Sequence, residues 1–162
     1  MVSYGSNSAK ILLNNGKGVF NPGGDILVSL GIPGRITAAD TNGDQNVDLI
    51  VPCAFDRTVN VMLGTGLGSF SSSGAFAVGM GPNTAAVGDF NGDKKNDLAI
   101  SNASSGNVSI LLGSGQGQFV AAPIPSVSAG NTASFIVAAD VNEDSKADLV
   151  LVNTGDNSMS VF

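Results

Sequence analysis

Three stretches of the chain share one pattern of oxygen-bearing side chains: "DTNGDQNVDLIV" (40–51), "DFNGDKKNDLAI" (89–100) and "DVNEDSKADLVL" (140–151). Each places a carboxylate or an amide at positions 1, 3, 5 and 9, counted from its first aspartate. Calcium takes about six to eight oxygen ligands, whereas magnesium keeps several bound waters and suits such a set less well. With the main-chain carbonyl at position 7 added, each stretch can wrap one ion, so the spacing predicts three Ca²⁺ sites per chain.

The predicted ligands use side chains at four positions and a main-chain carbonyl at the fifth, so a lysine at position 7 is expected to be harmless. They are Asp40, Asn42, Asp44, Asp48 and the carbonyl of Asn46; Asp89, Asn91, Asp93, Asp97 and the carbonyl of Lys95; and Asp140, Asn142, Asp144, Asp148 and the carbonyl of Lys146. Ten of the thirteen acidic residues lie in these stretches, and three divalent cations would cancel the formal net charge of −6. Without a cation, carboxylates this close together repel one another.

Two other interpretations of the stretches compete with the calcium site. An EF-hand needs a bidentate glutamate at position 12 and glycine at position 6, and none of the three has either. Aspartate and asparagine also form turns without any metal, but three copies with identical spacing favour a ligand set. The third copy has Glu143 where the others have Gly43 and Gly92, so its backbone is less free there, and we expect this site to bind an ion as well.

Other chemistry is poorly represented in the chain. There is no histidine, so the usual general base near neutral pH is missing and we expect no enzyme activity. The glycine-rich segments "GTGLGSF" and "GSGQGQF" lack the helix context or the Gly-Lys-Ser/Thr ending of nucleotide-binding loops, which favours turns. Cys53, the only cysteine, lies in the apolar segment "LIVPCAF" and is expected to be a buried hydrophobe.

The composition also limits the partners. The seven basic residues are scattered, so a nucleic acid is not an expected partner. No apolar run approaches the ~20 residues that a membrane span needs. The first ten residues do not show the pattern of a signal peptide.

The elements that must position these stretches belong to a repeat. Phe20, Phe70 and Phe119 close three similar segments and lie 50 and 49 residues apart, close to the spacing of the acidic stretches. Each unit shows four short apolar runs separated by Gly, Asn, Asp and Ser, which is typical of antiparallel strands joined by tight turns. No segment sustains a helical period, so the fold class is predicted to be all-β.

A four-stranded antiparallel unit of about 50 residues has the size of a β-propeller blade, whereas solenoid repeats are usually shorter and tandem sandwich domains longer. We expect one repeat domain over 1–162 with two complete blades, 34–82 and 83–132. A partial blade of third and fourth strands covers 1–33, and one of first to third strands covers 133–162. In each blade the acidic stretch would join the first strand to the second.

The pattern Asp-x-Asn-Gly-Asp-x-x-x-Asp-Leu, followed by an apolar strand and later by "LLGSGQGQF", resembles the FG-GAP/VCBS repeat. This is the calcium-binding blade of integrin α-subunit propellers, fungal lectins and many bacterial surface proteins. The resemblance covers nearly the whole chain in three copies. It implies a propeller with structural Ca²⁺ in an extracellular or cell-surface setting, and says little about function because the family hosts many activities.

Three function classes follow from the resemblance. The first is a calcium-stabilised binding or adhesion module with a protein or glycan ligand. The second is a lectin, for which the aromatic supply is small, since Tyr4 is the only tyrosine and there is no tryptophan. The third is a polysaccharide-processing enzyme module, which the missing histidine disfavours.

Three repeats do not close a ring, because propellers have about four to eight blades. Two expectations therefore compete. In one, a homodimer forms a six-bladed ring in which the N-terminal outer strand of one chain completes the last blade of its partner. In the other, the chain is a fragment of a longer propeller.

Overall fold

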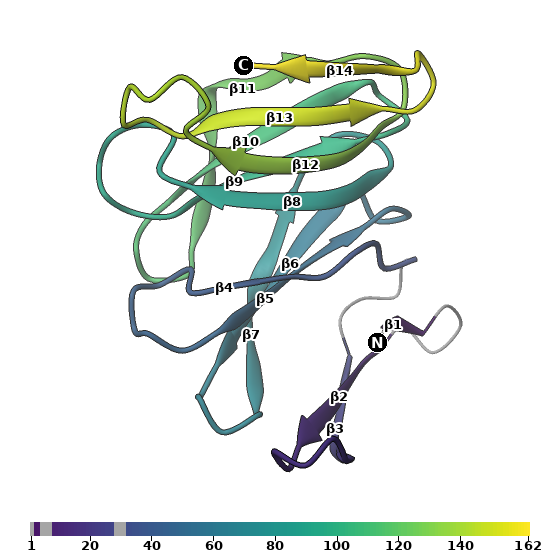
Figure 1. The fold of residues 1–162 in the computed structure, drawn as a ribbon, viewed down its shortest axis with the longest axis vertical. Coiled ribbons are helices and arrows are strands. Elements are labelled where there is room, and N and C mark those ends of the chain that lie inside the picture. The colour runs from purple at the N-terminus through teal and green to yellow at the C-terminus, as the bar shows by residue number, and fades with distance from the viewer. Residues whose placement is uncertain (1, 4–7, 28–31) are drawn as a thin grey trace.

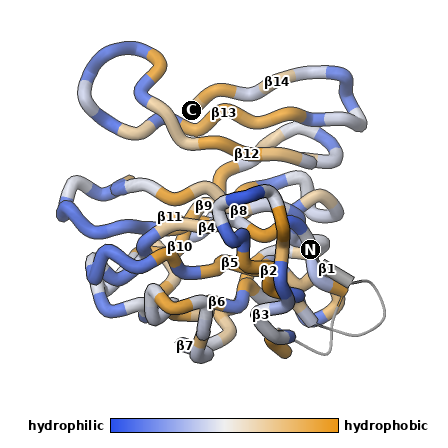
Figure 2. Tube along the Cα trace, turned by 60° about the horizontal axis from the view of Figure 1, so that its bottom comes forward, coloured by the Kyte–Doolittle hydropathy of each residue, from blue (hydrophilic) through white to orange (hydrophobic). Residues whose placement is uncertain are grey.

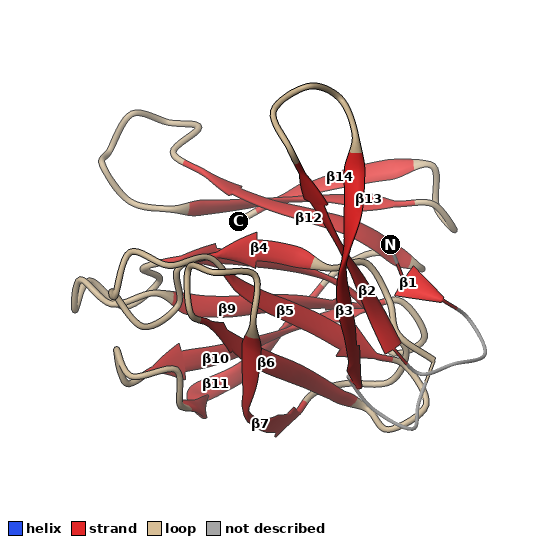
Figure 3. Ribbon diagram, turned by 90° about the horizontal axis from the view of Figure 1, so that it is seen from below, coloured by secondary structure: helices blue, strands red, loops and turns tan. Residues whose placement is uncertain are grey.

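The computed structural model describes residues 2–3, 8–27 and 32–162, and all regular structure in these residues is β-strand (Figure 3). The strands form four separate antiparallel sheets, each made of neighbours in sequence. The two complete sheets are β4 (Thr37–Ala39), β5 (Asp48–Cys53), β6 (Thr58–Gly64) and β7 (Phe70–Ala77), then β8 (Pro82–Gly88), β9 (Asp97–Asn102), β10 (Asn107–Gly113) and β11 (Phe119–Ser128). The two three-stranded sheets are β1 (Val2–Ser3), β2 (Ser8–Asn14) and β3 (Phe20–Leu27), and β12 (Ala133–Ala139), β13 (Asp148–Asn153) and β14 (Ser158–Val161).

The sheets follow one another in chain order, from β1–β3 to β12–β14, as blades of an incomplete propeller (Figure 1). The all-β fold, with two complete four-stranded blades between two partial ones, is confirmed. In the complete sheets the first strand lies at the inner edge and the fourth at the outer edge. No helix long and apolar enough to cross a membrane occurs in the described part of the chain.

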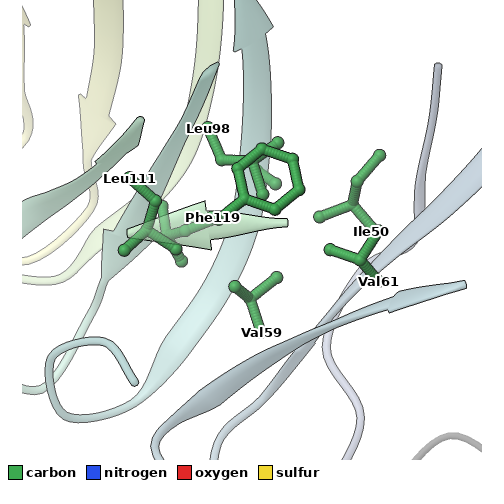
Figure 4. Close-up of a cluster of buried hydrophobic side chains, with 8 residues drawn as sticks. Ile50, Val59, Val61, Leu98, Leu111 and Phe119 are labelled. Atoms are coloured by element: carbon green, nitrogen blue, oxygen red, sulfur yellow. The ribbon is translucent and has the colours of Figure 1, made fainter. Parts of the chain in front are cut away.

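The second strand of each complete blade lies at the centre of the packing. All six residues of β5 and all six of β9 are buried, because both faces of these strands are covered by neighbouring sheets. Ile50 of β5 faces the β8–β11 sheet, where it joins Leu98 and Phe119 (Figure 4). Leu49 belongs to another buried cluster, which includes Ala9 of the β1–β3 sheet. Because its residues pack against a neighbouring sheet on each side, the apolar second strand β5 holds three sheets together. Burying a side chain of this size stabilises the folded state by about 1.5–3 kcal/mol.

The fourth strands are mostly exposed, but each begins with a phenylalanine, as the sequence predicts. Phe119 is buried, and its ring meets Phe76 edge to face at 5.3 Å between centroids, which joins two blades. The preceding turn contains Gly115 and Gly117 with φ of 79° and 76°. These angles suit glycine and confirm the interpretation of the glycine-rich segment as a turn. Cys53 is buried as expected.

Candidate functional site

The three acidic stretches form equivalent loops. They join β4 to β5, β8 to β9 and β12 to β13, which confirms their predicted place between the first and second strands. All three project from the same side of the molecule, the left side in Figure 1. The repeat therefore places the same set of oxygen atoms at the same end of successive blades.

The aspartate at position 1 organises the first turn of each loop. Oδ1 of Asp40 accepts the N–H of Gly43 at 2.7 Å, and Oδ2 accepts the N–H of Gln45 at 2.8 Å. In the second loop Asp89 accepts the same pair, from Gly92 (2.7 Å) and Lys94 (2.8 Å). In the third loop Asp140 accepts the N–H of Asp144 (3.1 Å), one position later than Gly43 and Gly92, and that of Ser145 (2.8 Å). In every loop the carboxylate at position 1 thus accepts hydrogen bonds from at least two backbone N–H groups that follow it.

The residues at positions 3 and 5 hold the rest of the loop through turns of their own. Oδ1 of Asn42 accepts the N–H of Asp44 at 3.0 Å, and Oδ1 of Asp44 accepts the N–H of Asn46 at 2.8 Å. The same pair of bonds, 2.8–2.9 Å long, occurs in the other two loops. Side chains of Asp and Asn that bond the backbone two residues on are the usual device for such turns.

The residue at position 6 of each loop takes a left-handed backbone conformation without being glycine. Gln45, Lys94 and Ser145 have φ of 68°, 66° and 67°. Such a residue costs about 1–3 kcal/mol and is kept only where its surroundings fix it. Its N–H is the group bound by the first aspartate, so the loop geometry and that carboxylate stabilise each other.

The aspartate at position 9 ties the loop to the blade. Asp97 is 0% exposed, and its two oxygens accept the N–H groups of Phe90 (3.0 Å) and Gly113 (2.8 Å), the latter at the end of β10. Asp48 likewise accepts N–H groups from Thr41 and Gly64, each at 2.8 Å. Ligand spacing identified these aspartates only as ligands and missed their role in holding three strands together.

A glycine at the end of the third strand makes this tie possible. A Cβ on Gly64 would overlap the carbonyl oxygen of Val47, and one on Gly113 would overlap that of Asn96. The loop therefore packs directly against the backbone of the third strand. The matching glycine of "MLG" and "LLG" in the sequence was the signal for this contact.

The loop carboxylates differ in their tendency to ionise. Hydrogen bonding to the N–H of Asn46 and then to the side chain of Asn42 lowers the pKa of Asp44, and the N–H of Lys146 does the same for Asp144. Partial burial raises the pKa of Asp89, but the N–H groups around it outweigh this effect and leave the pKa lowered.

For Asp97 the balance is reversed. Burial raises its pKa despite the N–H groups of Gly113 and Phe90. The outward part of the loops therefore favours the carboxylate form that a cation needs.

The oxygen atoms of each loop are of the kind that a hard cation binds, although here they accept hydrogen bonds from the backbone of the loop. Among the described residues, no three carboxylate, thiolate or imidazole groups converge into a cluster that could hold a metal ion. Instead, the oxygens of Asp40 and Asp44 point at N–H groups of their own loop. Each carboxylate oxygen has two lone pairs, so one hydrogen bond leaves capacity for a metal. The oxygen-only set therefore fits Ca²⁺ in chemistry, and the ligand assignment stays a prediction.

Lysine at position 7 does more than offer its carbonyl. Nζ of Lys95 lies 3.3 Å from Oδ2 of Asp93, and Nζ of Lys146 lies 3.3 Å from Oδ2 of Asp144. In these two loops the ammonium group thus pairs with a carboxylate oxygen at position 5, which is a predicted ligand of Ca²⁺. The first loop has the uncharged Asn46 at position 7.

One contact joins two loops directly. Nδ2 of Asn96 donates to the main-chain carbonyl of Asp40 at 2.7 Å, so position 8 of the second loop is bound to position 1 of the first. Ala147 occupies position 8 in the third loop and has no amide with which to repeat the bond. The sequence pattern did not single out Asn96, because the two residues are 56 apart along the chain. Tyr4, considered above for a sugar site, lies outside the described residues.

The family comparison covers the same loops and strands. The model of the FG-GAP-like repeat matches residues 40–100 and 89–151, and each match runs from one acidic loop through the second strand of the next blade. No curated protein matches the chain. The two family matches together span most of the sequence and contain all three loops. The chain therefore belongs to the family of FG-GAP-like repeat proteins.

Proposed function

We propose that the chain is an interaction module whose three acidic loops each bind Ca²⁺. One observation carries the proposal: the loops repeat not only the same residues but the same backbone turns, with residues 45, 94 and 145 all left-handed. These shared turns bend each loop back on itself, which supports positions 1, 3 and 5 as ligands of a single ion. The predicted carbonyls at position 7 would complete the set.

Binding of Ca²⁺ would act on the stability of the blades. An ion that binds only the folded chain adds about 2.7 kcal/mol per site when its concentration is 100 times the dissociation constant. For a chain of this size that corresponds to a rise in melting temperature of about 5–10 °C per site. The millimolar calcium outside cells would keep such sites filled, so we also place the protein in an extracellular or cell-surface setting.

The test is thermal unfolding with EDTA and with added Ca²⁺, combined with calorimetric counting of the bound ions. Asp40→Asn, Asp89→Asn and Asp140→Asn should each remove one ion, while Asp25→Asn, outside the loops, should remove none. An unchanged melting curve on addition of Ca²⁺, together with no heat of binding, would refute the calcium proposal.

The lysines at position 7 allow a sharper version of this test. Lys95→Gln removes the ammonium group that pairs with Asp93 and leaves the main-chain carbonyl in place. If Ca²⁺ uses that carboxylate, the second loop should bind Ca²⁺ more tightly in this variant. Lys10→Gln, which changes a lysine outside the loops, is the matched control. An equal affinity in both variants would mean that Ca²⁺ does not use Asp93.

The partner of the module is proposed to be another blade of the same kind. The chain is hydrophobic along much of β13 and β14 (Figure 2). Two apolar side chains of β14 are exposed, Met159 at 72% and Val161 at 59%. Their equivalents in the third blade, Val108 and Ile110, pack against the following sheet. On the β1–β3 sheet, Phe20 corresponds to the buried Phe119 and is 59% exposed. A second copy of the chain would cover both faces and form the six-bladed dimer, and light scattering that shows only the single-chain mass would exclude it.

Adhesion is the activity we propose for the assembled module, with a protein or glycan as ligand. The support is the family alone, whose repeat suggests an interaction module. We propose no catalytic role, since the chain has no histidine to act as a general base.

A further inference from the structure

The inner strands of three successive sheets line an open hollow that contains no residue of the acidic loops. β4, β8 and β12 follow one another through the middle of the molecule (Figure 1), and the hollow lined by their residues and Arg35 has a volume of about 510 Å³. This is within the range of roughly 300–1,000 Å³ typical of small-molecule sites. The side chains that matter here are Arg35, Thr37, Thr84, Ala86, Phe135 and Val137.

The wall of the hollow is held by cross-strand bonds and offers mainly alkyl groups. The hydroxyl of Thr37 donates to the carbonyl of Ala85 at 2.8 Å. The hydroxyl oxygen of Thr84 lies 3.0 Å from that of Ser101 and accepts the N–H of Ile136 at 3.1 Å. Both threonines thus use their hydroxyl groups within the fold. A ligand in the hollow would meet methyl groups and an aromatic ring, not free hydroxyls.

Arg35 is the one charged side chain that lines this wall. Its guanidinium carbon lies 5.8 Å from the centre of the Phe135 ring, a cation–π distance. The ion pairs found among the described residues join lysines to aspartates, and none of them includes Arg35. A guanidinium presents its N–H donors at its edge in a fork that matches two carboxylate oxygens.

Arg35 lies outside the acidic loops, and Asp40 is the nearest loop carboxylate along the chain, five residues away. The hollow thus has one cationic side chain beside an aromatic ring, in a chain of net charge −6.

We propose that this hollow is a binding site for a small monocarboxylate with an apolar body. Arg35 is the one cationic side chain that each chain brings to the wall, and one guanidinium balances one negative charge, which suits one monocarboxylate per chain. The carboxylate meets the edge of Arg35, and the apolar body lies against Phe135, Ala86 and Val137. The site is distinct from the calcium loops and does not depend on them.

The experiment measures binding of benzoate to the full chain by calorimetry and by NMR shift changes, in calcium-free buffer. Benzamide, a neutral compound of nearly the same shape, and inorganic phosphate are the comparison ligands. Benzoate should bind in a saturable way and shift the signals of Arg35 and Phe135, and the other two should bind at least tenfold more weakly. Absence of saturable benzoate binding, or equal binding of benzamide, would overturn the proposal.

Three variants locate the site. Arg35→Gln should weaken benzoate at least tenfold, whereas Arg57→Gln, the same change at the other arginine, should leave the affinity unchanged. Arg35→Lys keeps the charge without the fork and should bind more weakly than the wild type; it also tests the assignment if Arg35→Gln fails to fold. Unaltered benzoate affinity in a folded Arg35 variant would overturn the assignment.

Discussion

Replacing Asp97 with alanine should destabilise the protein even when no calcium is present. The carboxylate is buried and accepts the N–H groups of Phe90 and Gly113. Leaving a buried donor without its acceptor costs about 1–3 kcal/mol, so two lost acceptors give a loss of about 2–6 kcal/mol. If the residue served only as a calcium ligand, its removal would cost little in EDTA.

The assay is urea unfolding followed by circular dichroism in EDTA, which removes any contribution of the metal. Asp148→Ala is the first matched control: Asp148 accepts one N–H, from Val141, and is only half-buried, so we expect a loss of about 1–3 kcal/mol. Asp93→Ala, at an exposed position, removes the acceptor of the N–H of Lys95 and should cost about 0.5–1.5 kcal/mol, less than Asp97→Ala. A loss for Asp97→Ala that is no larger than that for Asp93→Ala would refute the anchoring role.

The pH dependence provides a second check on Asp97. Burial raises the pKa of this carboxyl above its ordinary value of 3.8. A carboxyl with a raised pKa in the folded state favours folding when protonated, so its contribution is present below 3.8 and is lost as the pH rises through the raised value. In EDTA, the free energy of unfolding of the wild type should therefore fall relative to that of Asp97→Ala as the pH rises from 3.8 through the raised pKa. If the stability advantage of the wild type over Asp97→Ala increased with pH over this range, the raised pKa of Asp97 would be contradicted.

Three further changes test the loop geometry by the same unfolding assay. Gly113→Ala would push a methyl group into the carbonyl of Asn96 and should cost about 1–3 kcal/mol, more than Gly88→Ala, whose nearest neighbours are movable side-chain atoms; an equal cost would deny the close approach. Glu143→Gly should stabilise the protein by up to about 1 kcal/mol, because Glu143 has a φ of 64° that glycine adopts freely, and a clear loss would show that the side chain contributes. Asn96→Ala removes the bond to Asp40 and should cost about 0.5–1.5 kcal/mol, and no change would mean that the two loops are independent.

The blades were predictable because their signals are local and repeated. The second strand reads as a continuous apolar run at residues 98–100 and 149–151, and the turn before the fourth strand carries glycine at residues 115 and 117. Each of these features predicts the structure of a few neighbouring residues, and the period of about 50 residues predicts how the strands group into blades. Fold class and blade order therefore followed from the sequence alone.

The contacts between blades were not predictable in the same way. Asn96 bonds the carbonyl of Asp40, and the guanidinium of Arg35 lies over Phe135, a residue 100 positions away. Nothing in the residues next to Arg35 indicates that ring, because the contact exists only once three inner strands lie together. Such sites depend on how successive blades are placed, which a repeat pattern does not specify.

The position-9 aspartates show why ligand spacing alone misjudged the loops. Spacing treats the four oxygen-bearing positions as equivalent, but burial makes them different: Asp97 is buried and bound to two strands, whereas Asp93 is exposed and paired with a lysine. The inner aspartate closes the loop onto the blade through hydrogen bonds that need no metal. The outer carboxylate is the group whose charge a cation would neutralise. For the proposed calcium sites we therefore expect substitutions at positions 3, 5 and 7 to change the affinity for calcium while the blade stays folded, whereas a substitution at position 9 should alter the blade itself.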